Sequence, residues 1–88
     1  MFRETFIKVK QELGVTGRAL SEQSGVDNSR ISEYINNKRD ISTETLWELL
    51  QGLEALNSGA IKLYLSILLR SLGTSQDLAI QLVDIAMA

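Results

Sequence analysis

At 88 residues the chain has the length of one domain, and a domain this small buries only about 60% of its unfolded surface, so every helix must contribute to one core. Hydrophobic residues make up 44% of the chain, charged residues 23%, and the net charge is −2, which excludes an intrinsically disordered protein. Cysteine and histidine are both absent, which excludes disulfides, thiolate nucleophiles, imidazole bases and the usual zinc ligands. We therefore expect neither an enzyme nor a bound metal or cofactor.

The chain carries no pattern typical of export or of membrane insertion. The segment MFRETFIKVK has charges interspersed among its apolar residues, unlike the apolar region of a signal peptide. The longest charge-free apolar run, Leu63 to Leu69, is far short of the roughly 20 residues that span a bilayer. We expect a cytoplasmic protein that makes no membrane contact.

The first predicted element is a helix over residues 2–13. Four apolar residues recur there at spacings of four, three and four, which places them on one helical face. These residues are Phe2, Phe6, Val9 and Leu13. Gly14 then supplies the left-handed residue with which helices commonly end.

The same start signal for a helix appears three times after Gly14. Thr16, Asp27 and Ser42 are each suited to cap a helix, because their side-chain oxygens can accept an amide proton of the first turn. An apolar residue precedes each cap and another follows it four residues later, the pattern of a hydrophobic staple. The pairs are Val15 with Leu20, Val26 with Ile31, and Ile41 with Leu46. The pattern predicts helices over residues 17–24, 28–36 and 43–56.

Only Gly25, Val26 and Asp27 separate the second predicted helix from the third. Gly25 can adopt the left-handed conformation that ends a helix. Two helices joined this tightly cross at a large angle, which is the helix-turn-helix arrangement. In that arrangement the second helix is held where the major groove of DNA can accept it.

Residues 2–56 resemble the phage repressor and Cro family of helix-turn-helix DNA-binding proteins. The resemblance rests on small Ser21 four residues before Gly25, on the exit loop NNKR at residues 36–39, and on three apolar core positions. These positions are Leu20, Val26 and Ile31. The chain departs from the family at Gly17, where glutamine is frequent, and at Asn37, which replaces a loop glycine. Asparagine enters the left-handed region more readily than most residues, so we expect Asn37 to be tolerated there.

The helix over residues 28–36 has a polar face opposite its apolar one. Ile31, Tyr34 and Ile35 are expected to point into the core. The opposite face is the candidate base-reading surface: Asn28, Ser29, Ser32 and Glu33. Asparagine can bind adenine with two hydrogen bonds, serine can bond to several base edges, and glutamate can accept from cytosine. The resemblance places base contacts at Asn28, Ser29 and Glu33. The alternative is that these side chains only face water.

Basic and amide groups flank this face at positions suited to the DNA backbone. Arg30 lies beside it and can reach a base edge or a phosphate. The other candidate phosphate contacts are Arg18, Asn36, Asn37, Lys38, Arg39 and Ser42. Arg18 and Ser42 are included because they lie at helix N-termini, which favour anions. Residues 1–44 have seven basic and seven acidic residues, so the excess acid lies in the second half.

After the break at residues 57–59, residues 60–72 are predicted to form a helix with a narrow polar stripe, about 80° wide at 100° per residue. The stripe consists of Lys62, Ser66 and Arg70. One apolar side can pack on the preceding helices: Ile61, Leu65, Leu68 and Leu72. A second apolar side needs other cover: Leu63, Tyr64, Ile67 and Leu69.

A last predicted helix, beginning at Thr74 or Ser75, can cover part of that second apolar side. The spacing does not decide whether it covers its own chain or a partner. Because closed two-fold dimers are the commonest oligomers, we expect a homodimer. Its expected interface comprises Leu63, Tyr64, Ile67, Leu69, Leu78, Leu82 and Ile85.

The fold expected from these features is an all-α bundle of five to six helices that contains a helix-turn-helix. Residues 1–56 would form the DNA-binding region, and residues 57–88 would complete one compact domain and form the dimer. The resemblance implies a sequence-specific regulator of transcription, a homodimeric repressor that binds an inverted repeat in double-stranded DNA. The alternative is a protein-binding module, such as an antitoxin or adaptor, whose apolar C-terminal helices bind a second protein such as a toxin or antirepressor.

Overall fold

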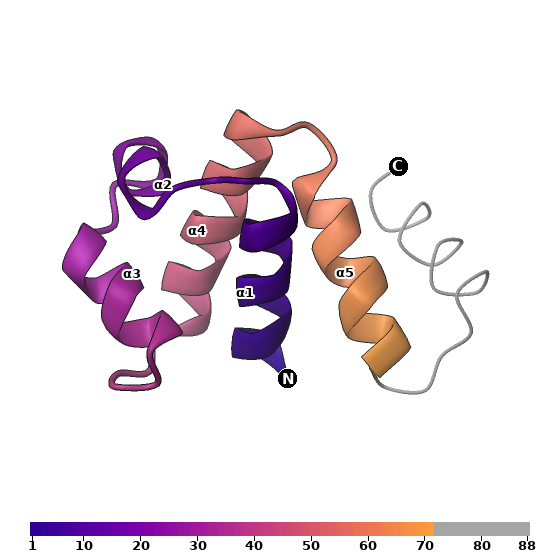
Figure 1. Cartoon of the computed structure of the whole chain (residues 1–88), viewed down its shortest axis with the longest axis horizontal. Coiled ribbons are helices and arrows are strands. Elements are labelled where there is room, and N and C mark those ends of the chain that lie inside the picture. The colour runs from indigo at the N-terminus through magenta and orange to yellow at the C-terminus, as the bar shows by residue number, and fades with distance from the viewer. Residues whose placement is uncertain (72–88) are drawn as a thin grey trace.

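The computed structural model describes residues 1–71, and within them every element of regular secondary structure is an α-helix (Figure 1). The helices are α1 (Phe2–Glu12), α2 (Gly17–Ser24), α3 (Asn28–Ile35), α4 (Thr43–Leu56) and α5 (Ala60–Ser71). The all-α prediction is confirmed, and α1 and α3 end one residue earlier than predicted. The predicted last helix, with Leu78, Leu82 and Ile85, lies outside the described residues.

Helix α4 packs against α2 on one side and against α5 on the other. Helix α2 packs on α4 and on α3, while α5 packs on α1 and α4 (Figure 1). All five helices contribute nearly fully buried side chains to the core, with Ala60 and Tyr64 coming from α5. The largest of the fully buried side chains are Phe6, Val9, Leu20, Ile31, Leu49 and Leu53. None of the helices in residues 1–71 is long and apolar enough to cross a membrane.

Two of the three predicted N-caps are confirmed. The hydroxyl of Thr16 accepts the amide proton of Ala19 at 3.1 Å, and the hydroxyl of Ser42 accepts that of Thr45 at 3.1 Å. The prediction for Asp27 is wrong, because its side chain accepts no amide proton of α3. The Asp27 carboxylate is instead hydrogen-bonded to the hydroxyl of Ser29, a local donor that competes for the same oxygens.

The turn between α2 and α3 is built by Gly25 and Ser21. Gly25 adopts the predicted left-handed conformation with a φ of 75°, and its amide donates to the carbonyl of Ser21 at 2.9 Å. The Ser21 hydroxyl donates in turn to the carbonyl of Val26 at 2.6 Å. A small hydroxyl residue at this position therefore stitches the last turn of α2 to the chain that enters α3.

Gly52 permits a close approach of α4 to α2. A Cβ atom at Gly52 would lie 3.0 Å from Cβ of Ser24 and 3.1 Å from a methyl group of Leu20. Glycine within a helix costs about 1 kcal/mol of stability relative to alanine. At this position the absence of a side chain lets α4 lie close to α2. The sequence pattern alone gave no sign of this contact.

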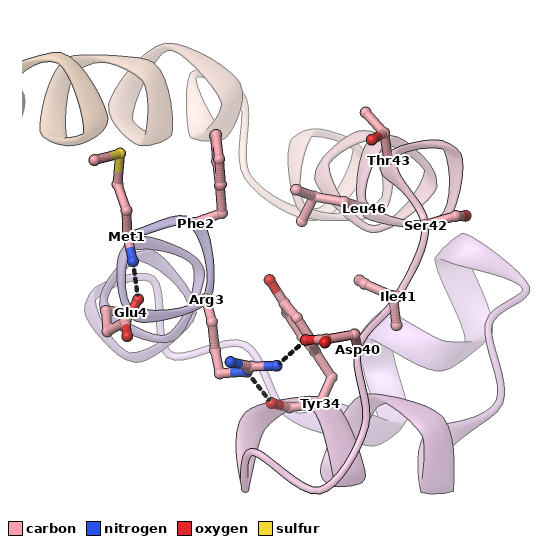
Figure 2. A pocket seen from close by; sticks show the side chains of 10 residues that line it. All are labelled: Met1, Phe2, Arg3, Glu4, Tyr34, Asp40, Ile41, Ser42, Thr43 and Leu46. Carbon is pink, nitrogen blue, oxygen red and sulfur yellow. Dashed lines mark hydrogen bonds and ion pairs between the residues drawn. The ribbon is translucent and has the colours of Figure 1, made fainter.

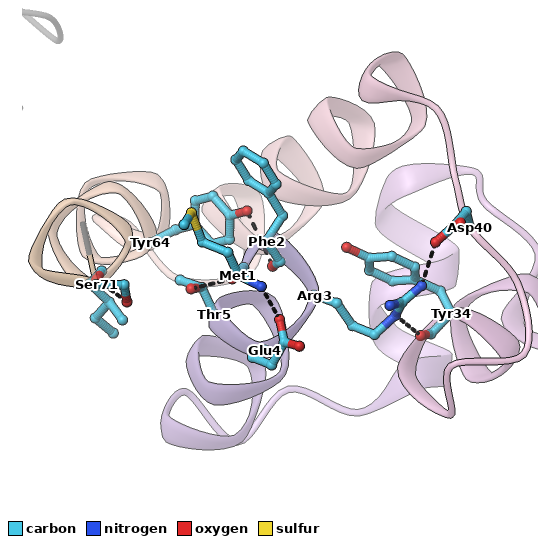
Figure 3. Close-up of polar contacts among 10 residues, drawn as sticks. Met1, Phe2, Arg3, Glu4, Thr5, Tyr34, Asp40, Tyr64 and Ser71 are labelled. Carbon is cyan, nitrogen blue, oxygen red and sulfur yellow. Dashed lines mark hydrogen bonds and ion pairs between the residues drawn. The ribbon is translucent and has the colours of Figure 1, made fainter.

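Helix α5 is anchored to the core through Ala60, Ile61, Tyr64 and Leu68, all of which are buried. Tyr64 was expected on the apolar side that needs cover from a last helix or a partner, and it is 2% exposed within the single chain. Its hydroxyl donates to the carbonyl of Phe2 at 3.3 Å (Figure 3), and burial raises its pKa to about 12. Leu63 and Ile67 are half-buried and pack against the core, and Leu69 is half-buried.

The start of α5 is capped from a distance by Glu54 of α4. Its two carboxylate oxygens accept amide protons from Gly59 at 2.8 Å and from Ile61 at 3.0 Å. These backbone hydrogen bonds hold the pKa of Glu54 below its usual value. The cap fixes the chain through the break, where Gly59 has a φ of 94°.

Candidate nucleic-acid interface

Helix α3 has one buried face and one solvent-facing face, as the sequence predicted. Ile31 and Tyr34 are 1% and 5% exposed, and Ile35 is half-buried against the same core. The predicted reading residues lie on the other face. Asn28, Ser29 and Ser32 are exposed, Glu33 is half-exposed, and Arg30 beside them is exposed.

The amide of Asn28 lies over the first residue of α2. A Cβ atom at Gly17 would be 2.7 Å from Oδ1 of Asn28, closer than real side chains approach. Gly17 therefore leaves the space that the Asn28 amide occupies. An alanine at this departure from the family pattern would require the exposed Asn28 side chain to move aside.

The exit loop, residues 36–39, leaves α3 through a left-handed residue. Asn37 has a φ of 60°, as expected for a residue in the place of a glycine. Its amide donates to the carbonyl of Tyr34 at 3.2 Å, and the amide of Lys38 donates to the carbonyl of Glu33 at 2.8 Å. The side chains of Asn36, Asn37, Lys38 and Arg39 are all exposed. The loop therefore presents its amides and cations next to the outer face of α3.

Two pairs of candidate DNA contacts bind each other in the free protein. Nε of Arg39 lies 3.0 Å from a carboxylate oxygen of Glu33, and both side chains are nearly half exposed. Nδ2 of Asn36 donates to the hydroxyl of Ser32 at 3.4 Å. The reading face and the exit loop are therefore joined by side chains as well as by the backbone. An exposed ion pair of this kind contributes little to stability, so it is free to rearrange on binding.

The remaining candidates lie at the starts of α2 and α4. The side chain of Arg18 is 87% exposed and pairs loosely with Glu22 at 3.6 Å. Ser42 is exposed, but its hydroxyl is engaged by the amide and the hydroxyl of Thr45. Arg18 is thus the more available of the two for an anion.

A helix-turn-helix family model matches residues 7–55, from within α1 to the end of α4. The chain belongs to the Cro/C1-type helix-turn-helix family. No curated protein and no solved structure matches it. This family is a DNA-binding regulatory family and is not typically enzymatic. The chain is therefore a DNA-binding regulator of transcription. In this family's terms α2 and α3 are the two helices of the motif.

Sequence reasoning missed Arg3, which precedes the stretch matched by the helix-turn-helix model. Its Nε donates to the carbonyl of Tyr34 at 2.7 Å, and one terminal nitrogen donates to Oδ1 of Asp40 at 2.6 Å (Figures 2 and 3). The same nitrogen lies 3.3 Å from the carbonyl of Arg39. The guanidinium is also 4.9 Å from the centre of the Tyr34 ring. No periodicity or cap marked Arg3, because all of its partners are more than thirty residues away.

Tyr34 is the point where α1, α3 and the exit loop meet. Its ring packs against Phe6 at 5.8 Å between centroids, and burial raises the pKa of its hydroxyl above the usual value. Beside it lies a hollow of about 300 Å³ between the start of α1 and the start of α4, with Phe2, Ile41 and Leu46 in its wall (Figure 2). The guanidinium of Arg3 therefore packs against the ring of a buried side chain.

Proposed function

We propose that this helix-turn-helix protein is a homodimeric repressor that binds an inverted repeat, with α3 in the major groove of each half-site. The observation that carries the proposal is the juxtaposition of a polar, exposed outer face on α3 with the exposed amides and cations of the exit loop. Base edges are read by short polar side chains in the groove, and basic or amide groups beside it hold the phosphates.

The reading side chains proposed are Asn28, Ser29, Ser32 and Glu33. Asn28 is the strongest of these, because it is exposed and its amide can bind adenine with two hydrogen bonds. Arg30 reaches a base edge or a phosphate. Arg18, Asn36, Asn37, Lys38, Arg39 and Ser42 hold the backbone of the DNA.

A dimer is proposed because one chain has little electrostatic attraction for DNA. The net charge is −2, and nonspecific affinity depends on how many phosphates are neutralised. Two copies on one operator double the contacts. The half-buried Leu63, Ile67 and Leu69 of α5 support a partner surface there. Leu78, Leu82 and Ile85 complete the proposed interface, outside the described residues.

The experiment that tests the proposal is selection of bound duplexes from a random DNA pool at near-physiological salt, followed by sequencing. We expect enrichment of an inverted repeat whose half-site centres lie about 10 base pairs apart. We propose that the protein acts in the cytoplasm and represses transcription by occupying a promoter. Enrichment of a single half-site would refute the dimer alone.

Absence of any enrichment, from protein shown to be folded, would refute the repressor. It would favour the second hypothesis, in which the C-terminal helices bind another protein such as a toxin or antirepressor. Dimerisation of the purified chain separates the two, because a surface made for a different protein stays exposed in the absence of that protein.

A further inference from the structure

We propose that Arg3 is a positioning residue for DNA binding: it fixes the exit loop of α3 so that Lys38 and Arg39 meet the phosphate backbone. This inference rests on the proposed function of the loop. Arg3 precedes residues 7–55, the stretch that the helix-turn-helix model matches. Its role is therefore not contained in the motif itself.

The guanidinium of Arg3 holds the end of α3 from which the exit loop leaves. The last carbonyls of a helix lack amide donors from a following turn, and the carbonyl of Tyr34 is one of these. It accepts from Nε of Arg3 at 2.7 Å and from the amide of Asn37 at 3.2 Å. Arg3 thus strengthens the same acceptor that holds the left-handed Asn37 in place.

The far end of the loop is held by the same side chain. One terminal nitrogen of Arg3 binds the carboxylate of Asp40 at 2.6 Å and lies 3.3 Å from the carbonyl of Arg39. A planar guanidinium can bridge these acceptors at once, whereas a lysine ammonium offers its protons from a single point. Arg3 of α1 therefore binds the chain on both sides of the exit loop, at Tyr34 before it and at Asp40 after it.

Arg3 itself is poorly placed to attract DNA. Its side chain is only 20% exposed, and the carboxylate of Asp40 offsets its charge. Lys38 and Arg39, by contrast, are exposed. A shallow hollow of about 190 Å³ is lined by Arg3 and by residues 37–40, so a direct phosphate contact by Arg3 is the alternative to be tested.

The test uses the full chain and the operator obtained by selection, with affinity measured over a range of salt concentration. Arg3→Met keeps an unbranched stem against Tyr34 but removes the guanidinium. Each phosphate contact contributes about 0.9 to the slope of log affinity against log salt. We expect Arg3→Met to reduce that slope by about 1 to 2 per protomer, with base preference unchanged.

Two further variants separate positioning from charge. Arg3→Lys keeps the charge, and we expect it to behave like Arg3→Met; a wild-type slope in Arg3→Lys would overturn the proposal. In a protein that carries Lys38→Ala and Arg39→Ala, adding Arg3→Met should leave the slope unchanged. A further fall of about 0.9 in that background would mean that Arg3 contacts phosphate directly. Because Arg3→Lys retains the packing of α1, it carries the test if Arg3→Met does not fold.

A measurement without DNA keeps this proposal distinct from the proposed function. Hydrogen exchange of the amides of Asn37 and Lys38 reports whether the loop is held in the free protein. We expect both amides to exchange about tenfold faster in Arg3→Lys, while amides of α4 keep their rates. Unchanged loop exchange would overturn the positioning role even if the wild type binds DNA. Failure of the wild type to bind any duplex would refute the repressor instead.

Discussion

Helices α2 and α3 are equal in length and adjacent in the chain, yet they are held in different ways. Each spans eight residues and buries apolar side chains in the same core. Helix α2 is capped by Thr16, stitched to the turn by Ser21 and pressed against α4 at Gly52. Helix α3 has no side-chain cap bonded to its amides, and its outer face is occupied by exposed polar groups.

The difference separates the residues that stabilise this helix-turn-helix from those that we propose for recognition. Substitutions around α2 alter packing or capping, both of which enter the free energy of unfolding directly. The polar contacts that the outer side chains of α3 make with their own chain are exposed to solvent, such as the ion pair of Glu33 with Arg39, so changes there have small effects on folding. The residues proposed for recognition can therefore differ without loss of the fold, provided that α2 stays packed on α4.

The largest effect on stability is expected from closing the gap between α2 and α4. Gly52→Val should lower the free energy of unfolding by about 2 kcal/mol or more, because its side chain must displace Ser24 and Leu20. Denaturant unfolding provides the measurement. Ala55→Val on the exposed side of α4 is the matched control and should cost only the small helix propensity of valine. Equal losses in the two variants would contradict the close approach.

On α3 the comparison predicts lost specificity with unchanged stability. Asn28→Ala should cost about 1 to 3 kcal/mol of discrimination at one base position in each half-site. Its free energy of unfolding should stay within about 0.5 kcal/mol of wild type. Gly17→Ala should change preference at that position less than Asn28→Ala does, because the exposed Asn28 amide only has to move aside and is still present. Competition binding with single-base operator variants checks both, and a uniform loss across all sequences would reject direct readout.

A smaller contrast is expected between the two cap positions. Thr16→Ala should lower the free energy of unfolding by about 1 kcal/mol, because an amide of α2 loses its acceptor. Asp27→Ala should cost less than about 0.5 kcal/mol, because Asp27 accepts only from the exposed hydroxyl of Ser29. Thermal unfolding of the two variants beside wild type measures the contrast. If Asp27→Ala is as costly as Thr16→Ala, α3 is capped in solution after all.

The smallest effect on stability is expected at Glu54. Its carboxylate caps α5, whereas the carboxylate of Asp27 does not cap α3. The pKa of Glu54 is lowered by the amides of Gly59 and Ile61. A carboxyl whose pKa is lower in the folded state stabilises the protein above its unfolded pKa, about 4.3, and that stabilisation is lost as pH falls through the folded pKa. Glu54→Gln should therefore lose less stability than wild type below about pH 4.3. Parallel acid titrations with the same slope would contradict the cap.

Much of the fold and of the interface was predictable because the relevant signals are local. Spacing of apolar residues placed the helices, Thr16 and Ser42 placed two caps, and Asn37 marked the left-handed exit from α3. Each signal involves residues no more than a few positions apart. The outer face of α3 follows in the same way, since helical periodicity separates it from Ile31 and Tyr34.

Contacts between distant residues, or between competing local groups, were not predictable. The burial of Tyr64 depends on how α5 lies against α1, and the partners of Arg3 are in another helix and its exit loop. Asp27 has the residue type of a cap, but the hydroxyl of Ser29 occupies its carboxylate. Pattern analysis ranks what a residue can do, whereas the neighbours present in the fold decide which possibility is realised.

The sequence by itself determined the five described helices, the tight turn and the polar face of α3, because backbone conformation and amphipathicity are set within a few residues. Only the tertiary structure decided that Gly52 brings α4 against α2, that Gly17 makes room for Asn28, and that Arg3 holds the exit loop. These three depend on distances between helices. Such distances follow from packing the whole core, which no single stretch of the sequence specifies.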